Sequence, residues 1–260
     1  MTVVSVRRDP GLWLLLHARP WRDRRHDRRG HCAVCGEEGR QVRQRWVLAP
    51  ELARRWGTGL AERESMFCEH CGSSLRVRRI AEVLVELYAE RATSLAELVR
   101  EDAFRALRIA EINSIGRMHP VLAEAPGLVH VEYPEEDIQA LSWADGSFDL
   151  VLTSETLEHV PDPALALRET LRVLRPGGRH VFTVPLDPAV EATRSRADLP
   201  AEHHGRGGGP FALVTRKADM VVYTDFGPDL GDVVRAAGFA YEARGTGHGL
   251  VSVATRPVVA

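Results

Sequence analysis

Four cysteines are the residues whose types and spacing most directly predict chemistry. They form two C-x2-C pairs, Cys32-Ala-Val-Cys35 and Cys68-Glu-His-Cys71, separated by 32 residues. A C-x2-C turn directs two thiolates at one point, and two such turns complete the tetrahedral ligand set of Zn²⁺. A glycine follows each pair, as a tight turn requires (Gly36 and Gly72). The pattern therefore predicts a zinc site whose ligands are Cys32, Cys35, Cys68 and Cys71.

Such a site has no open coordination position, so we expect the zinc to be structural. Two disulfides or a chance spacing are the alternatives. His70 is a possible substitute ligand, but four thiolates make it a bystander. Three arginines after the second pair (Arg76, Arg78 and Arg79) leave a nucleic-acid-binding ribbon open. Their spacing is equally typical of the solvated start of a helix.

The length and composition of the whole chain are those of an ordinary globular protein. Its 260 residues can hold one medium domain and a small one. It is 44% hydrophobic and 27% charged, and its net charge of -2 gives no basic field for nucleic acid or anionic lipid. We therefore do not expect a nucleic-acid partner. A local basic run, Arg19–Arg29, predicts a solvated and partly disordered leader over residues 1–30.

No export or membrane segment is predicted. The apolar run near the start, Leu12–Leu16, is shorter than the apolar core of a signal peptide (about 7–15 residues) and far shorter than a spanning helix. The paired arginines before it (Arg7 and Arg8) are weak evidence for twin-arginine export. Cysteines in such a chain favour metal binding over disulfides. We expect a cytoplasmic protein without membrane insertion.

After the cysteines, helical and strand patterns alternate. Apolar residues at helical spacing predict helices between residues 76 and 106, with Thr93 or Ser94 as a cap and Glu97 behind it. Short apolar runs bounded by turns then predict buried strands. These strands are Leu107–Ile112, Leu128–Tyr133, Phe148–Thr153 and His180–Val184.

The second half continues this alternation. A helix is predicted over Leu165–Leu174, ended by the turn Arg175–Gly178. Near the end, a helix over Leu230–Ala237 stops at Gly238. A closing strand pair follows, Phe239–Arg244 and Leu250–Ala254. The order is that of an α/β fold.

One segment has a recognisable pattern. Asp145–Pro185 reads DGSFDLVLTSETLEHVPDPALALRETLRVLRPGGRHVFTVP. It resembles the class I S-adenosylmethionine-dependent methyltransferases of the small-molecule type (type 11). In that family an acidic turn and an F-D strand lead into E-H-V-x-D-P, a helix, L-R-P-G-G and another strand. Weaker likeness continues through Tyr223-x-x-Phe226-Gly227 and Ala236–Phe239. The stretch from Arg63 to Ser73 resembles a subgroup with R-E-S-x-x-C-x-x-C-G-S.

The resemblance covers about residues 31–255 and implies a fold. We expect a Rossmann-like, doubly wound, mostly parallel sheet with an antiparallel last strand, preceded by a small zinc-knuckle module. The expected organisation is a leader (1–30), a zinc-binding module (31–75), linking helices (76–106) and a methyltransferase domain (107–260).

The resemblance also implies S-adenosylmethionine as cofactor. Family members carry an E/D-x-G-x-G-x-G loop after the first strand, and the corresponding residues here are Glu111–Gly116. This chain keeps Glu111 and one nearby glycine, Gly116, but has Asn113 and Ile115 at expected glycines. Asparagine tolerates positive φ, whereas isoleucine does not.

Further cofactor contacts follow from the family pattern. Glu132, at the end of the second strand, would accept the ribose hydroxyls; its alternative role is an exposed strand-end carboxylate. Asp137 would accept from the adenine amino group, and Ile138 would pack on the ring. Only four residues separate Tyr133 from Ile138, so the family's third strand is missing or very short. Ser154 would line the pocket near the methyl donor.

Three histidines are candidate catalytic residues. His159 is the first candidate for general base, since a near-neutral pKa suits proton removal. Alternatively, it braces its loop. His203 and His204 begin the glycine-rich stretch His203–Pro210, which would form either a lid or a disordered loop.

The expected function is methyl transfer to an O, N or C nucleophile of a small molecule: a sugar, a saccharide conjugate or a specialised metabolite. Two alternatives stay open. One is a degenerate methyltransferase scaffold with another activity, motivated by the altered loop and the short third-strand region. The other is a zinc-ribbon module that binds RNA or protein.

Overall fold

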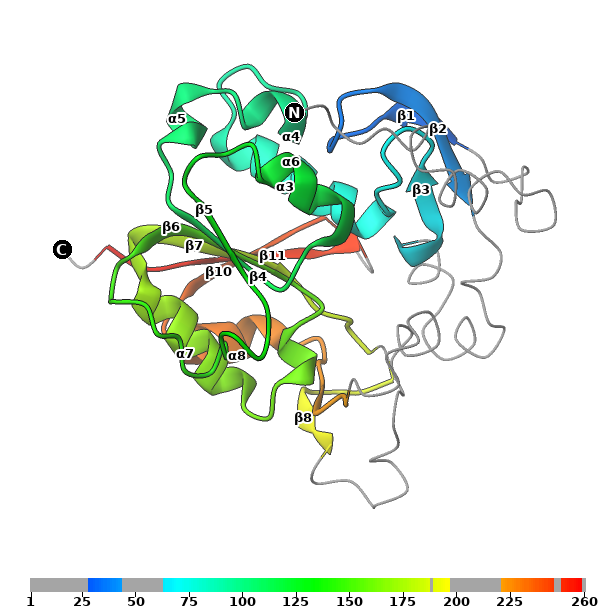
Figure 1. Cartoon of the computed structure of the whole chain (residues 1–260). Helices are drawn as coiled ribbons and strands as arrows, with labels where there is room; N and C mark the ends of the chain where they lie inside the picture. The colour runs from blue at the N-terminus through cyan, green and yellow to red at the C-terminus, as the bar shows by residue number, and fades with distance from the viewer. Residues whose placement is uncertain (1–27, 44–62, 188, 197–220, 246–248, 259–260) are drawn as a thin grey trace. The chain divides into compact units, whose positions relative to one another are not determined.

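The structure is a computed structural model, which describes residues 28–43, 63–187, 189–196, 221–245 and 249–258 (Figure 1). These residues fall into two compact units. The cysteine unit comprises the described residues up to Leu107, with Ile115–Leu128 and Gly245–Val251. The sheet unit comprises the remainder.

The cysteine unit begins with a small antiparallel sheet in the order β1-β2-β3, which the sequence did not predict (blue and cyan in Figure 1). Its strands are Arg28–His31, Glu38–Arg43 and Met66–Cys68. Strand β1 therefore begins three residues before the predicted start of the zinc-binding module. The sheet positions both C-x2-C pairs, because β1 leads into the first pair and β3 ends at Cys68.

Helix α3 (Leu75–Tyr88) follows the second pair, as predicted. Ser74 caps its start by accepting a hydrogen bond from the Val77 amide. Its buried side chains recur at helical spacing and include Val77, Ile80 and Leu84.

The second predicted helix is instead two short helices, α4 (Leu95–Leu98) and α5 (Asp102–Arg105). Glu97 accepts hydrogen bonds from the amide (2.7 Å) and the hydroxyl (3.0 Å) of Thr93 at the start of α4. The 3-10 helix η5 (Gly116–Met118) packs on α3, and α6 (His119–Leu122) packs on α4.

The sheet unit is built on six strands in the order β10-β11-β7-β6-β4-β5. Strands β4, β6 and β7 are parallel, and β11 runs antiparallel to β7, which confirms the predicted sheet. The bounds are β4 Ile109–Ile112, β5 Leu128–Val131, β6 Phe148–Ser154, β7 Leu174–Thr183, β10 Ala240–Arg244 and β11 Val251–Thr255.

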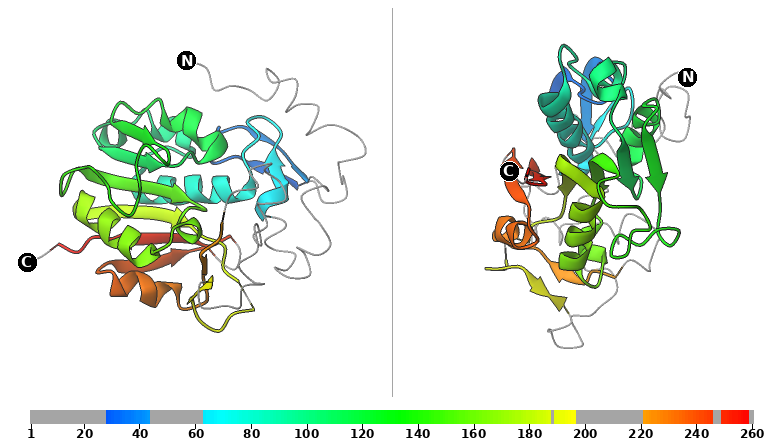
Figure 2. Two further views of the ribbon diagram at one scale, coloured as in Figure 1. Left: turned by 60° about the horizontal axis from the view of Figure 1, so that its bottom comes forward. Right: turned by 90° about the vertical axis from the view of Figure 1, so that its left-hand side faces the viewer.

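Two predicted helices, α7 (Pro163–Val173) and α8 (Leu230–Ala236), lie on the same side of this sheet (Figure 2). Their apolar residues join those of the strands in one core cluster, with Val151 and Phe182 from the sheet, Leu167 from α7 and Val234 from α8. This packing fixes the carboxyl ends of the parallel strands, where the predicted site lies.

Residues 132–147 are all described, and they form no strand. Strand β5 is therefore the last strand at its side of the sheet. Of the two expectations, a missing third strand is the one found.

The turn predicted at Arg175–Gly178 needs correction. Helix α7 does end at Val173, but β7 begins at Leu174 and runs through these residues. The register of β7 on β6 shifts there, from Phe148 opposite Leu174 to Leu150 opposite Arg179. Two backbone hydrogen bonds to Arg256, both of 2.9 Å, hold the irregular part of β7. The Gly177 amide donates to the Arg256 carbonyl, and the Arg256 amide donates to the Gly178 carbonyl.

A short antiparallel pair completes the described fold: β8 (Arg194–Ser195) with β9 (Thr224–Asp225). No helix among the described residues has the length and apolar character needed to cross a membrane.

Candidate functional site

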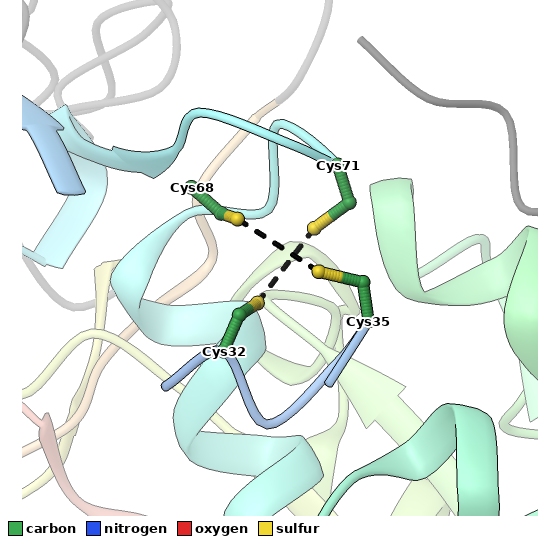
Figure 3. A group of neighbouring side chains, drawn as sticks. All are labelled: Cys32, Cys35, Cys68 and Cys71. Atoms are coloured by element: carbon green, nitrogen blue, oxygen red, sulfur yellow. Dashed lines mark hydrogen bonds between the residues drawn. The ribbon is translucent and has the colours of Figure 1, made fainter. Parts of the chain in front are cut away.

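The four cysteine side chains point at one centre (Figure 3). Their sulfur atoms all lie within 4.8 Å of one another. The Sγ atoms of Cys32 and Cys71 are 3.7 Å apart, and those of Cys35 and Cys68 are 3.9 Å apart. A zinc ion bound by four thiolates at about 2.3 Å requires sulfur separations of about 3.8 Å. The cluster therefore fits a tetrahedral zinc ion, and its distances are far from the roughly 2.05 Å of a disulfide.

Each C-x2-C pair closes in a tight turn. The Gly36 amide donates to the Cys32 carbonyl at 2.8 Å, and the Gly72 amide donates to the Cys68 carbonyl at 2.9 Å. Both glycines have positive φ (78° and 75°), the conformation for which glycine was expected there. His70 is outside the cluster: its Nε2 lies 3.3 Å from the Glu38 carbonyl, while its amide donates to the Cys68 sulfur at 3.4 Å.

Arg78 is buried beside the sulfur cluster, with 1% of its surface exposed. Its Nη1 donates to the Ser73 carbonyl and its Nη2 to the Gln41 amide oxygen, both at 3.0 Å. Burial lowers the pKa of the Arg78 guanidinium, while the nearby thiolates of the cluster oppose that shift. A zinc ion bound by four thiolates would carry a formal charge of -2, which this buried cation would partly offset.

The three arginines after the second cysteine pair were expected at the solvated start of a helix, and this is wrong for two of them. Arg78 is buried, and the Nε of Arg76 binds the buried Glu64 at 2.9 Å. Only Arg79, with a side chain 48% exposed, matches the expectation.

The first C-x2-C turn also caps helix α4. The carbonyl of Ala33 accepts from the Leu95 amide at 2.7 Å, and that of Val34 accepts from the Ala96 amide at 3.1 Å. These amides have no partner within their own helix, so the turn satisfies them. A Cβ on Gly36 would lie 2.9 Å from the Ser94 hydroxyl. The cysteine turn and α4 thus form one packed structure.

At the carboxyl edge of the sheet, Asn113 connects two strands. Its backbone has φ of 60°, as its place in the predicted glycine loop requires. Its amide donates to the Val131 carbonyl at 2.9 Å, and its Oδ1 accepts from the Tyr133 amide at 3.2 Å. Glu132, between those two residues, has a side chain 55% exposed, with Oε1 3.7 Å from Nε2 of His130. The structure therefore brings the loop and Glu132 together.

The remaining loop residues take three different roles. Glu111 is fully buried on β4. Ile115 is buried with φ of -84°, so this isoleucine avoids the conformation it could not adopt. Gly116 has φ of 53°, and a Cβ added there would meet open space. Asn113 and Gly116 therefore both have the left-handed backbone that the family's glycine loop leads us to expect.

The predicted adenine contacts, Asp137 and Ile138, lie in the segment that follows β5. The Asp137 Oδ1 accepts from the Gln139 amide at 2.9 Å and from its side-chain nitrogen at 3.3 Å. Ile138 is 4% exposed and belongs to the core cluster, with Leu141. Because no third strand follows β5, this segment itself closes the core, and Ile138 is buried there. Its expected packing on the adenine ring stays a prediction.

Ser154 is the last residue of β6, and His159 follows shortly after it. The Ser154 hydroxyl lies 2.8 Å from the Thr183 hydroxyl at the end of β7. His159 ends the 3-10 helix η6 (Leu157–His159). Its Nδ1 lies 2.9 Å from the Val221 carbonyl, and its Nε2 lies 3.6 Å from the Glu158 carboxylate.

A carbonyl only accepts, so Nδ1 of His159 carries the proton and Nε2 holds the lone pair in the neutral ring. Burial lowers the pKa of His159 below its ordinary value, which favours that neutral form. Asp162 instead caps α7, accepting from the Leu165 amide at 2.9 Å. His203 and His204 lie outside the described residues.

Comparisons with known proteins agree with this fold. A family model described as "Methyltransferase domain" matches residues 83–182. A demethylmenaquinone methyltransferase from Clavibacter sepedonicus is 32% identical over 182 residues, covering 66% of this chain and 71% of that protein. A ubiquinone biosynthesis O-methyltransferase from Albidiferax ferrireducens is 40% identical over 82 residues, covering 31% of this chain and 29% of that protein.

Other similarities are shorter or weaker. The matched segments span only 16% to 29% of the first three curated relatives. A Burkholderia thailandensis 1,6-didemethyltoxoflavin-N1-methyltransferase structure is 17% identical, with a TM-score of 0.44, covering 72% of this chain and 80% of that one. The Clavibacter relative, most of whose length is covered, is decisive, and the family match over residues 83–182 agrees with it. The chain belongs to the class I S-adenosylmethionine-dependent methyltransferases.

Proposed function

We propose that this chain transfers the methyl group of S-adenosylmethionine to an O, N or C nucleophile of a small molecule. The observation that carries the proposal is the Asn113 bridge, which holds the altered cofactor loop against the strand end that bears Glu132. These are the two features that the family uses to hold the amino-acid and ribose parts of the cofactor.

Each proposed cofactor residue has a separate task. Glu132 accepts hydrogen bonds from the ribose hydroxyls, and Asp137 accepts one from the adenine amino group. The backbone at Asn113 and Gly116 approaches the amino-acid moiety, with Glu111 buried behind the loop. Ser154 lines the methyl-donor side. S-adenosylmethionine supplies an already activated methyl group, so the protein contributes alignment and exclusion of water.

His159 removes the proton from an O–H or N–H acceptor in this proposal. Its hydrogen bond to Val221 reserves Nε2 for that proton. The lowered pKa of the imidazole keeps Nε2 unprotonated near neutral pH. His203 and His204 remain further candidates on the sequence alone.

The zinc ion is proposed as a structural group. Cys32, Cys35, Cys68 and Cys71 supply all four ligands and leave no coordination position for substrate. Because the first cysteine turn caps α4, the ion stabilises the helices as well as the turns.

The relatives support a small-molecule acceptor, since the curated matches are named for ubiquinone and demethylmenaquinone methylation. A sugar, a saccharide conjugate or another specialised metabolite is the acceptor that we expect. The proposed location is the cytoplasm.

Mass spectrometry tests the activity. The full, zinc-loaded protein, incubated with S-adenosylmethionine and a panel of hydroquinones, sugars and sugar conjugates, should add 14 mass units to an acceptor. The His159→Gln variant is the control for the active site, and it should slow the transfer by about 10²- to 10⁴-fold. Cofactor binding without any transfer across a broad panel would count against the methyl-transfer proposal.

A second candidate is an enzyme on this scaffold that does not transfer methyl groups. The absence of a strand in residues 132–147 and the burial of Ile138 favour it, because both alter the adenine side of the site. Calorimetry separates the two: heat of binding with S-adenosylmethionine and S-adenosylhomocysteine supports methyl transfer, and no heat at millimolar cofactor supports the alternative.

A further inference from the structure

The proposed base is held by a strap, defined here as residues 194–196 and 221–225, which contain strands β8 and β9. The Val221 carbonyl receives the proton of His159 Nδ1 at 2.9 Å. Two residues later, the Tyr223 amide donates to the carbonyl of Glu158 at 2.8 Å. The strap therefore binds both the ring and the backbone of the short helix η6 that carries His159.

A buried ion pair joins the two halves of the strap. The Arg196 amide donates to the Tyr223 carbonyl at 2.7 Å. Its guanidinium donates twice to Oδ1 of Asp225, from Nε at 2.9 Å and from Nη2 at 2.7 Å. Both residues are almost fully buried. Because an unpaired buried charge is costly, neither partner can leave without disturbing the strap.

Arg194 provides a natural comparison on the same strand. Its Nη2 reaches the other oxygen of Asp225 at only 3.5 Å, and its side chain is 47% exposed. Such an exposed contact contributes little to stability. The two arginines thus share one carboxylate, but only Arg196 is built into the strap.

Charged groups from each neighbouring segment act on the imidazole. The carboxylate of Glu155 and the hydrogen bond to the Val221 carbonyl favour its protonated form, and the Glu158 carboxylate lies 3.6 Å from Nε2. Burial and the positive charge of Arg196 oppose them, and burial is the largest contribution. Asp225 offsets part of the Arg196 charge through the ion pair.

We propose that Arg196, paired with Asp225, is a positioning residue for His159: it holds the strap so that Nδ1 donates to Val221 and Nε2 remains the proton acceptor. This inference rests on the proposed function. In the reaction, the nucleophile–carbon bond forms as the carbon–sulfur bond breaks, and the acceptor's proton passes to Nε2. Neither Arg196 nor Asp225 touches the reacting atoms.

Nuclear magnetic resonance of imidazole nitrogens in the full, zinc-loaded protein tests this, with the His159 signals assigned by their loss in His159→Gln. In the wild type, the neutral ring should be the Nδ1–H form and should titrate below 6.5, the ordinary value. Arg196→Gln removes a positive charge and loosens the strap. Loss of the charge and of burial raises the pKa of His159, whereas loss of the Val221 bond lowers it. Because burial is the largest contribution, the pKa should move toward that ordinary value, with a mixture of ring forms.

Arg194→Gln is the matched control and should leave the His159 titration unchanged. Should Arg196→Gln fail to fold, Arg196→Lys keeps the charge but cannot make both bonds to one oxygen, and should show the mixture of ring forms with a smaller change in pKa. The proposal is overturned if Arg196→Gln titrates like the wild type, or if the wild-type ring is the Nε2–H form.

These measurements need no methyl transfer. If the ring behaves as expected while no acceptor is methylated, the proposed function fails alone. The opposite result is methyl transfer with the same acid limb of the pH–rate profile in Arg196→Gln and in the wild type. In that case the positioning role fails alone.

Discussion

The Oδ1 atom of Asn113 accepts a hydrogen bond from the amide of Tyr133 at 3.2 Å, across the ends of two neighbouring strands. A glycine in the same place could adopt the backbone conformation but could not make this bond. The substitution in the family's glycine loop therefore adds a connection between β4 and β5. In a sheet without a third strand, that connection holds the exposed end of β5.

Substitutions at Asn113 should separate conformation from bonding. Asn113→Val places a β-branched residue at φ of 60°, so we expect a loss of about 1–2 kcal/mol in unfolding free energy relative to Asn113→Gly. Urea denaturation of both variants measures the difference. Equal stabilities would show that the left-handed conformation is not maintained in solution.

Arg78 should be essential to the cysteine unit. Arg78→Met removes the donors to Ser73 and Gln41 and leaves the thiolates without their buried cation, so we expect at least about 2 kcal/mol of destabilisation. Competition with a chromophoric chelator should show weaker zinc binding. The control is the exposed Arg79→Met, and equal zinc affinity in the two variants would contradict the role given to Arg78.

Removal of zinc should open the cysteine turns and the start of α4 together. Hydrogen exchange after chelation should accelerate at the amides of Leu95 and Ala96, whose acceptors lie in the first cysteine turn. Amides of β6 and β7 serve as the internal reference and should stay protected. A zinc-free protein with unchanged exchange would rule out a structural ion.

His180 should make the fold sensitive to acid. Its ring is fully buried, with Nε2 2.9 Å from the Thr153 hydroxyl and no hydrogen bond from Nδ1 to any described residue. Burial lowers its pKa to about 3. Between pH 6.5 and 3 the unfolded chain binds a proton that the native protein does not, so stability falls as the pH falls through that range.

The free energy of unfolding at pH 4.5 should be lower than at pH 7 by roughly 3 kcal/mol because of His180. His180→Gln keeps a partner for Thr153 but has no titrating ring, so its unfolding free energy should decline correspondingly less. Urea denaturation at the two pH values provides the test. Parallel declines in both proteins would show that His180 gains its proton without unfolding.

The sequence predicted those helices and strands whose formation depends on interactions between residues close together in the chain. The apolar spacing around Ile80 and Leu84 gave α3, and the run from Phe148 gave β6, because each pattern reflects burial of one element. The cysteine cluster was also predictable from the sequence. The spacing within each C-x2-C pair already fixes a tight turn, so the fold has only to bring the two turns together.

Long-range contacts set the features that the sequence did not predict. The strand through Arg175–Gly178 depends on Arg256, about eighty residues later, so locally it resembles a turn. Arg78 gave no sign of burial, because its partners come from β2 and the second cysteine turn. The strap around His159 joins segments on either side of residues 197–220, and nothing in either segment alone predicts the ion pair.

The central claim is that adenosyl binding at the carboxyl edge of the sheet depends on Glu132. Calorimetric titration of S-adenosylhomocysteine into the wild type and Glu132→Ala tests it most directly. We predict saturable binding by the wild type and a loss of about 1–3 kcal/mol in the variant, roughly a 5- to 150-fold weaker Kd. An unchanged Kd in Glu132→Ala, or no binding by the wild type at millimolar ligand, would contradict the account.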